Sequence, residues 1–250
     1  MKVAISQPTY LPWMGYFDLM DQVDAFVFLD SVQFEKRSWQ QRNRIKTLSG
    51  LQWLTVPVAV RGKQEQQISE AVIQEPASLE NHLRTIELNY RRAPHFAAYY
   101  PEFASVFQDS QASPLLVDLN LRLIRWMMQA LGLRTQVYRS SEMHQSGRRT
   151  ELLANIAQSL GATEYLSALG SADYLLGEMN VMTDRRITVT FQHYQHPEYK
   201  QLFPPFLPYA TVLDLLLNEG PRSLEILRSG SRTPYSPEEV RQMLAKQVEV

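Results

Sequence analysis

The sequence predicts an α/β fold in which a mainly parallel, Rossmann-like sheet is flanked by helices. Short apolar segments with strand character alternate along the chain with amphipathic segments, a pattern typical of parallel sheets. A chain of 250 residues suffices for such a domain, and its folding should bury ~70% of the surface of the unfolded chain. We therefore expect one α/β domain over residues 1–250, with a helical insertion around 78–131 and a surface helical tail over 232–250.

The N-terminal elements follow from short runs of apolar residues. Residues 3–6 are apolar and end at Gln-Pro, which favours an extended backbone, so we expect a buried strand there. Residues 17–23 have helical apolar spacing, and residues 25–30 are a β-branched and aromatic run typical of a second strand. Residues 32–47 are basic, polar and aromatic without an apolar period, so this segment should lie between core elements. Strand character resumes over residues 52–60.

The remaining elements are predicted in the same way. Proline residues separate three candidate helices, roughly 78–92, 95–108 and 113–131. Further strands are expected over 134–139, 164–169 and 187–191, and further helices over 151–160, 211–218 and the C-terminal segment.

Composition excludes several classes of protein and of site. The chain has 25 basic and 26 acidic residues, so its net charge of −1 does not indicate a nucleic-acid partner. It has no cysteine, which excludes disulfides, cysteine-ligated metal centres and a thiol nucleophile. Residues 1–13 lack the apolar core of a signal peptide, and no segment approaches the ~20 apolar residues of a membrane span. We therefore expect a cytoplasmic protein without a membrane span.

Residues that follow predicted strands are the first candidates for a site, because open parallel sheets bind ligands beyond the carboxyl ends of their strands. After the first strand, the segment QPTYLPWMGY carries three rings that can stack on a base or a sugar. The alternative is that these rings cap the hydrophobic core. The candidate ligand contacts in this segment are Gln7, Tyr10, Trp13 and Tyr16.

A second cluster follows the second strand and combines a carboxylate with basic and amide side chains. Arginine offers forked donors that suit a phosphate or a carboxylate. A solvated basic face is the competing interpretation, although aromatic residues within the segment argue against it. Asp30 is a candidate general base, and the candidate binding residues are Gln33, Arg37, Trp39, Arg42, Asn43 and Arg44.

A third set of polar residues follows the strands of the second half. His193 and His196 have a spacing that suits a metal ion on a helix, but Pro197 breaks any helix, so we predict no metal site. A Ser/His/Asp triad is disfavoured because no G-x-S-x-G turn positions a serine. His196 is a second candidate general base. The candidate binding residues here are Ser167, Asp173, Tyr174, Tyr199 and Gln201.

Long motifs spread over most of the chain resemble the WbqC-like protein family. The motifs are QPTYLPWMGYFDLM, FVFLDSVQFEKRSWQQRNRIK, WLTVPV, EYLSALGSADYL and YQHPEYKQLFPPFLPYATVLDLLLNEG. Two segments depart from the family pattern: Ala168-Leu169, where a glycine is expected, and Tyr209-Ala-Thr, where Leu-Ser-Ile is expected. The resemblance implies a bacterial protein associated with gene clusters for O-antigen and related surface polysaccharides.

The predicted layout also resembles the HUP-type nucleotidylyltransferases, whose first loop carries an H-x-G-H motif. Trp13 and Tyr16 occupy the two histidine positions of that motif. Their rings cannot supply cationic contacts to a triphosphate, so a shared fold would not bring the same mechanism with it.

These observations and the resemblance predict an enzyme of surface-polysaccharide biosynthesis that transfers a group onto a nucleotide-linked or amino-bearing sugar. The expected partner is a small molecule, either a nucleotide sugar or an acyl donor, and no cofactor is identified. Two alternatives remain open: a nucleotidyl-transfer enzyme on a HUP-like fold, and a non-catalytic protein that binds a glycan or another protein.

Overall fold

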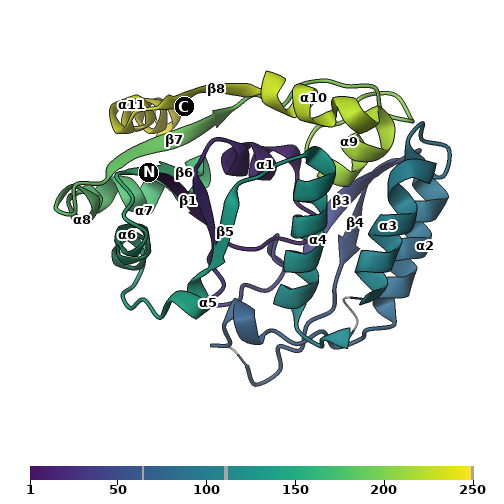
Figure 1. Cartoon of the computed structure of the whole chain (residues 1–250), viewed down its shortest axis with the longest axis horizontal. Coiled ribbons are helices and arrows are strands. Elements are labelled where there is room, and N and C mark those ends of the chain that lie inside the picture. The colour runs from purple at the N-terminus through teal and green to yellow at the C-terminus, as the bar shows by residue number, and fades with distance from the viewer. Residues whose placement is uncertain (64, 110–111, 249–250) are drawn as a thin grey trace.

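The computed structural model describes residues 1–63, 65–109 and 112–248 and contains a six-stranded sheet in the order β5-β2-β1-β6-β7-β8 (Figure 1). Five neighbouring strands are parallel, and β8 pairs with β7 in the antiparallel sense. This confirms the predicted α/β fold with a mainly parallel, Rossmann-like sheet. The strands are β1 (Lys2–Ser6), β2 (Ala25–Phe28), β5 (Gln136–Arg139), β6 (Glu164–Ser167), β7 (Thr188–Tyr194) and β8 (Ser231–Tyr235).

Both faces of the central strands are buried, which explains their continuous apolar character. Successive residues point to opposite faces, so Ala4 and Phe26 belong to one hydrophobic cluster while Val3 and Ala25 belong to another. The first cluster includes residues of α1 (Met14–Asp21), α2 (Ser78–Tyr90), α3 (Phe96–Asp109), α4 (Leu116–Leu131), α9 (Val212–Glu219) and α10 (Ser223–Ser229). The second includes residues of α6 (Thr150–Ser159), α7 (Ala172–Gly177), α8 (Met179–Thr183) and α11 (Pro237–Val248).

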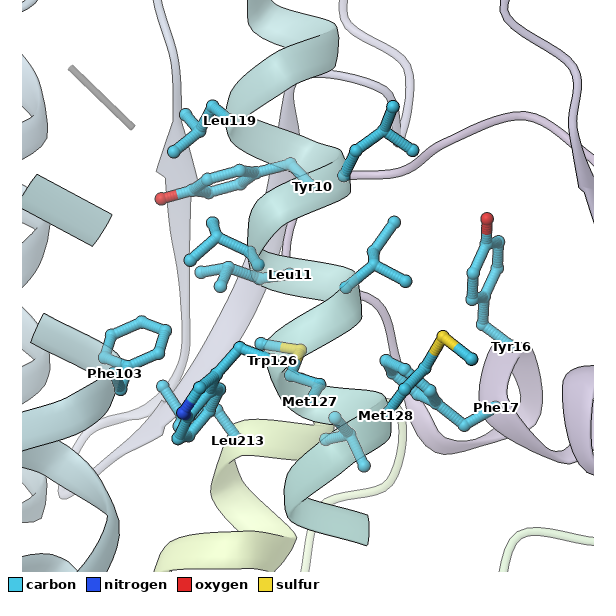
Figure 2. Packing of buried hydrophobic residues seen from close by; sticks show 14 of the residues in the cluster. Tyr10, Leu11, Tyr16, Phe17, Phe103, Leu119, Trp126, Met127, Met128 and Leu213 are labelled. Atoms are coloured by element: carbon cyan, nitrogen blue, oxygen red, sulfur yellow. The ribbon is translucent and has the colours of Figure 1, made fainter. Parts of the chain in front are cut away.

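Helix α4 is the centre of the larger cluster. Figure 2 shows Trp126 and Met127 of α4 packed with Phe103 of α3 and Leu213 of α9, while Tyr10 and Leu11 of the first loop lie along the same helix. The loop after β1 is therefore anchored in the core, which fixes where its exposed residues lie.

The basic segment contains a strand that its composition conceals. Residues Arg42–Thr47 form β3, which pairs in the antiparallel sense with β4 (Gly50–Thr55) in a separate hairpin. Buried polar residues such as Asn43 and Lys46 remove the apolar alternation by which a strand is recognised. Strand β4 also ends earlier than the strand expected over 52–60, because its pairing with β3 ends at Thr55.

The other predicted elements are found with small shifts. The three helices expected within 78–131 are α2, α3 and α4. The expected tail over 232–250 divides into most of edge strand β8 and helix α11, while residues 249 and 250 lie outside the described residues. Short helical segments complete the fold: α5 (Ser140–Met143) and the 3-10 turns Ile68–Glu70, Leu169–Ser171 and Gly220–Arg222. None of the described helices combines the length and the apolar character that crossing a lipid bilayer requires.

Asp30 joins the carboxyl ends of β2 and β5. Its fully buried carboxylate accepts hydrogen bonds from Arg139 Nε at 2.9 Å and Ser140 Oγ at 3.1 Å, and a charge-assisted contact from Arg139 Nη2 at 2.8 Å. The backbone N–H and the hydroxyl of Ser141 donate to the same carboxylate at 2.9 and 2.8 Å. The carboxylate is thus surrounded by donors from a single neighbouring strand end.

Removing the cation from this network should destabilise the fold. Arg139→Met leaves the Asp30 carboxylate buried without its charge partner, so the free energy of unfolding should fall by about 3 kcal/mol. Arg84→Met is the matched control, because Arg84 forms an exposed pair with Glu80 at 3.7 Å that should contribute less than about 1 kcal/mol. Denaturant unfolding measures both variants, and equally small losses would contradict a structural role for the Asp30 network.

Candidate ligand-binding pocket

The strand order places an opening at the carboxyl end of β1. The chain moves from β1 to β2 and then to β5 on one side, whereas β6 and β7 lie on the other side of β1. Open α/β sheets bind ligands at such a reversal, because the loops that follow the two adjacent strands leave toward opposite faces. Here those loops begin at Ser6 and Ala168, and both residues line a cavity of about 400 Å³.

The described lining of the cavity combines four aromatic rings with one cationic side chain. Its walls come from the loop after β1, from helix α1, from the β3–β4 hairpin and from the ends of β6 and β7. Its aromatic lining residues are Trp13, Tyr16, Trp39 and Tyr209, its cation is Arg44, and its polar residues are Ser6, Thr9, Asn43 and Gln192. The structure therefore brings together predicted residues of the first two clusters with the exits of β6 and β7.

Trp13 forms one wall of the pocket, and its ring can lie there because Gly15, which it covers, has no side chain. A Cβ atom at Gly15 would overlap the six-membered ring of Trp13, so the indole lies directly over the first turn of α1. The ring also packs edge-on against Tyr209 and Tyr194, with centroid separations of 5.3 and 5.7 Å. Tyr209 has a left-handed backbone (φ 64°), a conformation that costs ~1–3 kcal/mol outside glycine and is often found at functional sites.

Arg44 is held in the opposite wall by tryptophan rings. Its guanidinium carbon lies 5.7 Å from the ring centroid of Trp39 and 5.4 Å from that of Trp53, its partner on β4. Among the described residues Arg44 forms no ion pair, and its buried Nε atom has no hydrogen-bond partner. An arginine without a protein anion at the edge of an aromatic pocket is suited to a phosphate or carboxylate of a ligand.

Asn43 and Gln192 are fixed by hydrogen bonds to the backbone around the pocket. Asn43 donates to the carbonyl of Leu11 at 2.7 Å and accepts from the N–H of Arg44 at 2.8 Å. The amide nitrogen of Gln192 donates to the carbonyl of Gly15 at 2.7 Å and to the carboxylate of Asp18 at 2.6 Å. Asn43 thus connects β3 to the loop after β1, and Gln192 connects β7 to α1, and together they set the shape of the pocket.

Asp18 is a buried carboxylate beneath the pocket floor. It also accepts hydrogen bonds from Gln22 at 2.7 Å and from the hydroxyl of Ser231. Burial raises the pKa of the Asp18 carboxyl, and the hydrogen bonds from Ser231, Gln192 and Gln22 oppose that effect. Sequence reasoning missed Asp18 and Gln192, although a glutamine within the apolar run ITVTFQ is a signal that could have identified the second.

His196 lies one aromatic layer behind Trp13. Its ring stacks on Trp13 with centroids 6.1 Å apart and packs against Tyr209 at 5.3 Å. Nδ1 lies 2.9 Å from the carbonyl of Pro197, which can only accept, so Nδ1 carries the proton and the basic nitrogen is Nε2. Nε2 is buried without a partner among the described residues, and burial lowers the pKa of the imidazole. The ring is therefore a neutral base that reaches the pocket only if the aromatic layer moves.

Tyr199 and Gln201 hold the loop before α9 instead of lining the pocket. Both donate to the buried carboxylate of Asp214, at 2.6 and 3.0 Å, and Tyr90 donates to it at 2.8 Å. Burial raises the pKa of the Asp214 carboxyl, and these three hydrogen bonds oppose the shift. The network ties α2 and α9 to the loop that carries His196 and Tyr209.

Several predicted binding residues are buried or support others. Tyr10 is fully buried, and its hydroxyl lies 2.8 Å from Nδ1 of His82, whose pKa burial lowers to about 4. Gln7 accepts a hydrogen bond from Gln40 at 2.8 Å, and its carbonyl accepts one from Tyr16 at 3.1 Å. Ser167 is fully buried at the end of β6. Tyr10 and Ser167 are thus buried and do not line the pocket.

The other predicted residues lie outside the pocket lining. Arg42, two residues before Arg44 on β3, stacks on Trp53, with its guanidinium carbon 4.4 Å from the ring centroid. Gln33 lines a separate open hollow near Lys36, and Arg37 is exposed. Asp173 and Tyr174 lie on α7, exposed and half-buried respectively. Asp30 belongs to the network at β2 and β5 and does not line the pocket.

The position of Trp13 over Gly15 can be tested by adding one methyl group. Gly15→Ala should displace the indole or the first turn of α1 and lower the free energy of unfolding by about 1–3 kcal/mol. Gly177→Ala in α7 is the control, because a Cβ atom there meets no atom within 4 Å and alanine favours a helix. Urea unfolding of the two variants provides the comparison. Unchanged stability of Gly15→Ala would show that the indole does not cover α1.

The described residues include no group of three histidine, aspartate or glutamate side chains that could hold a metal ion. Comparison with known proteins found an uncharacterized protein, Rv1507c, from Mycobacterium tuberculosis. It is 40% identical over 228 residues, which cover 91% of this chain and 97% of that protein. No solved structure gave a significant match. The model of the WbqC-like protein family matches residues 7–226. This range includes every lining residue of the pocket except Ser6. The chain therefore belongs to the WbqC-like protein family.

Proposed function

We propose that this protein is a cytoplasmic enzyme of bacterial surface-polysaccharide biosynthesis that transfers a group onto a nucleotide-linked or amino-bearing sugar. The observation that carries the proposal is the pocket at the reversal of strand order, where aromatic rings surround Arg44, which forms no ion pair with any described residue. Its size suits part of a small molecule, and ring-bearing anions match its chemistry. The family's association with surface polysaccharides supports the sugar as the substrate class.

Each part of the pocket has a distinct role in this proposal. Trp13, Trp39 and Tyr209 hold a sugar or base ring by stacking, and Arg44 binds a phosphate or a carboxylate. Asn43 and Gln192 are positioning residues, because their hydrogen bonds fix the loops that carry the rings. The ligand thus meets one aromatic surface and one charge.

His196 is the proposed general base. In the transfer, the acceptor nitrogen or oxygen forms a bond to the transferred group, and the donor's leaving group takes the electrons of the bond that breaks. The proton lost by the acceptor passes to Nε2 of His196, which carries the lone pair of the neutral ring. This step requires Trp13 or Tyr209 to move, because both rings now cover the imidazole. Asp30 is the less suitable base, since its carboxylate is fully buried and surrounded by donors.

Ligand binding is tested by thermal shift against nucleotides, nucleotide sugars, coenzyme A thioesters and free sugars. A ligand at 100 times its Kd adds ~2.7 kcal/mol of stability. We expect a nucleotide sugar to raise the Tm of the wild type, and Arg44→Met to abolish the shift. Arg241→Met, which removes an exposed arginine on α11, should keep it. A shift that survives Arg44→Met, or the lack of any shift with nucleotide sugars, would contradict the proposal.

The exposed face of the β3–β4 hairpin favours a second candidate function, the non-catalytic binding of a glycan or a partner protein. Trp39 and Trp53 are 48% and 42% exposed, and they stack with Arg42 and Arg44 in a continuous row. Neighbouring exposed apolar rings form a patch of the kind that marks interaction sites, and tryptophan and arginine are enriched at binding hot spots. Under this alternative, a glycan or protein partner binds and no substrate is turned over, so product formation in the presence of a bound nucleotide sugar separates the two functions.

A further inference from the structure

A second hollow lies beside the pocket, on the other side of Trp13. It measures about 450 Å³ and opens at the carboxyl ends of β6 and β7. Trp13, Ala168 and Gln192 line both cavities, so the two are adjacent compartments that meet at the indole ring. The residues that line only the second hollow include Gly170, His193, Gln195 and Tyr235.

The two compartments differ in charge. The first contains Arg44, whereas the described residues that line the second include no acidic side chain, lysine or arginine. The second hollow instead offers the His193 ring, which stacks on Tyr235 at a centroid separation of 4.1 Å. Among the described residues no hydrogen bond reaches the nitrogens of this ring. A register shift between Phe191 and His193 also interrupts the pairing of β7 with β8, and such bulges often re-aim a side chain beside a site.

Gln192 determines the kind of group that can bind where the compartments meet. Its amide nitrogen uses both protons, one for the carbonyl of Gly15 and one for Asp18. The remaining hydrogen-bonding group of the side chain is the amide oxygen, which only accepts. A ligand that satisfies it must therefore donate, as a hydroxyl or an amino group does.

We propose that the second hollow is the acceptor compartment and binds an uncharged sugar ring, which stacks on the His193–Tyr235 pair and donates a hydroxyl or amide hydrogen to Gln192. The proposal rests on the proposed function and takes the case in which the acceptor is a sugar that carries no nucleotide, so the nucleotide sugar in the Arg44 compartment is the donor of the transferred group. The acceptor would then face that substrate across the edge of Trp13, which lines both cavities.

Gly170 allows the second hollow to be filled without strain. Its backbone lies outside the left-handed region, and a Cβ atom there would meet no atom within 4 Å. Gly170→Phe should therefore occupy the hollow and leave the fold and the first pocket intact. Gly177→Phe is the matched control, because Gly177 has equally open surroundings on α7 and lines neither cavity.

Saturation-transfer NMR with glucose, galactose, N-acetylglucosamine and N-acetylgalactosamine tests the inference. We expect at least one sugar to bind the wild type and Gly177→Phe but not Gly170→Phe, while Gly170→Phe keeps the thermal shift with the nucleotide sugar. Sugar binding that survives Gly170→Phe would overturn the acceptor compartment. So would the absence of binding by all four sugars.

These outcomes are distinct from a failure of the proposed function. If nucleotide sugars stabilise the protein but no free sugar binds, the second hollow alone loses its assignment. If a sugar binds and Gly170→Phe removes it although no nucleotide sugar stabilises the protein, the second hollow stands as a sugar site and the transfer reaction falls. His193→Phe adds a finer check, because it preserves ring stacking and should still weaken sugar binding through loss of the ring nitrogens.

Discussion

The reversal of strand order at β1 is the constraint on which the rest of the site depends. Because β2 and β6 flank β1 on opposite sides, the loops that follow β1 and β6 separate and leave a space at the strand ends. The β3–β4 hairpin and the loop before α9 close that space from two directions, through Arg44 and Tyr209. The place of the ligand pocket is thus a consequence of topology, and the side chains determine its shape and what it can hold.

Buried carboxylates keep these loops in place. Asp18 links α1 to β7 and β8, Asp214 links α2 and α9 to the loop that carries His196, and Asp30 links β2 to β5. Each is fully buried, and each accepts several hydrogen bonds, as an ionisable group must when water is excluded. Polar residues in the family motifs therefore hold the loops of the pocket in place. Asp30, which is a candidate general base in the sequence, is one such structural residue.

Much of the fold can be predicted from the sequence, because the spacing of apolar residues identifies strands that are buried on both faces and helices that are buried along one stripe. The strand at 25–28 and the helices at 78–90 and 116–131 are such cases. Strand β3 is not, because Asn43 and Lys46 are buried polar residues that disrupt the period. For the site, strand ends indicated Trp13, Tyr16, Trp39, Asn43 and Arg44, which the fold brings together. Gln192 and Tyr209 were missed because their roles arise from contacts between segments far apart in the sequence, and Tyr10 was misleading because a core ring and a stacking ring are the same residue type.

The most direct test of the central claim is a crystal structure of the protein bound to a nucleotide sugar that raises its Tm. The account predicts that the ligand lies at the carboxyl ends of β1 and β6, with a ring between Trp13 and Trp39 and an anionic group on Arg44. A ligand bound at the hollow beside Gln33 and Lys36, or along the edge strand β5, would show that the reversal of strand order does not define the binding site.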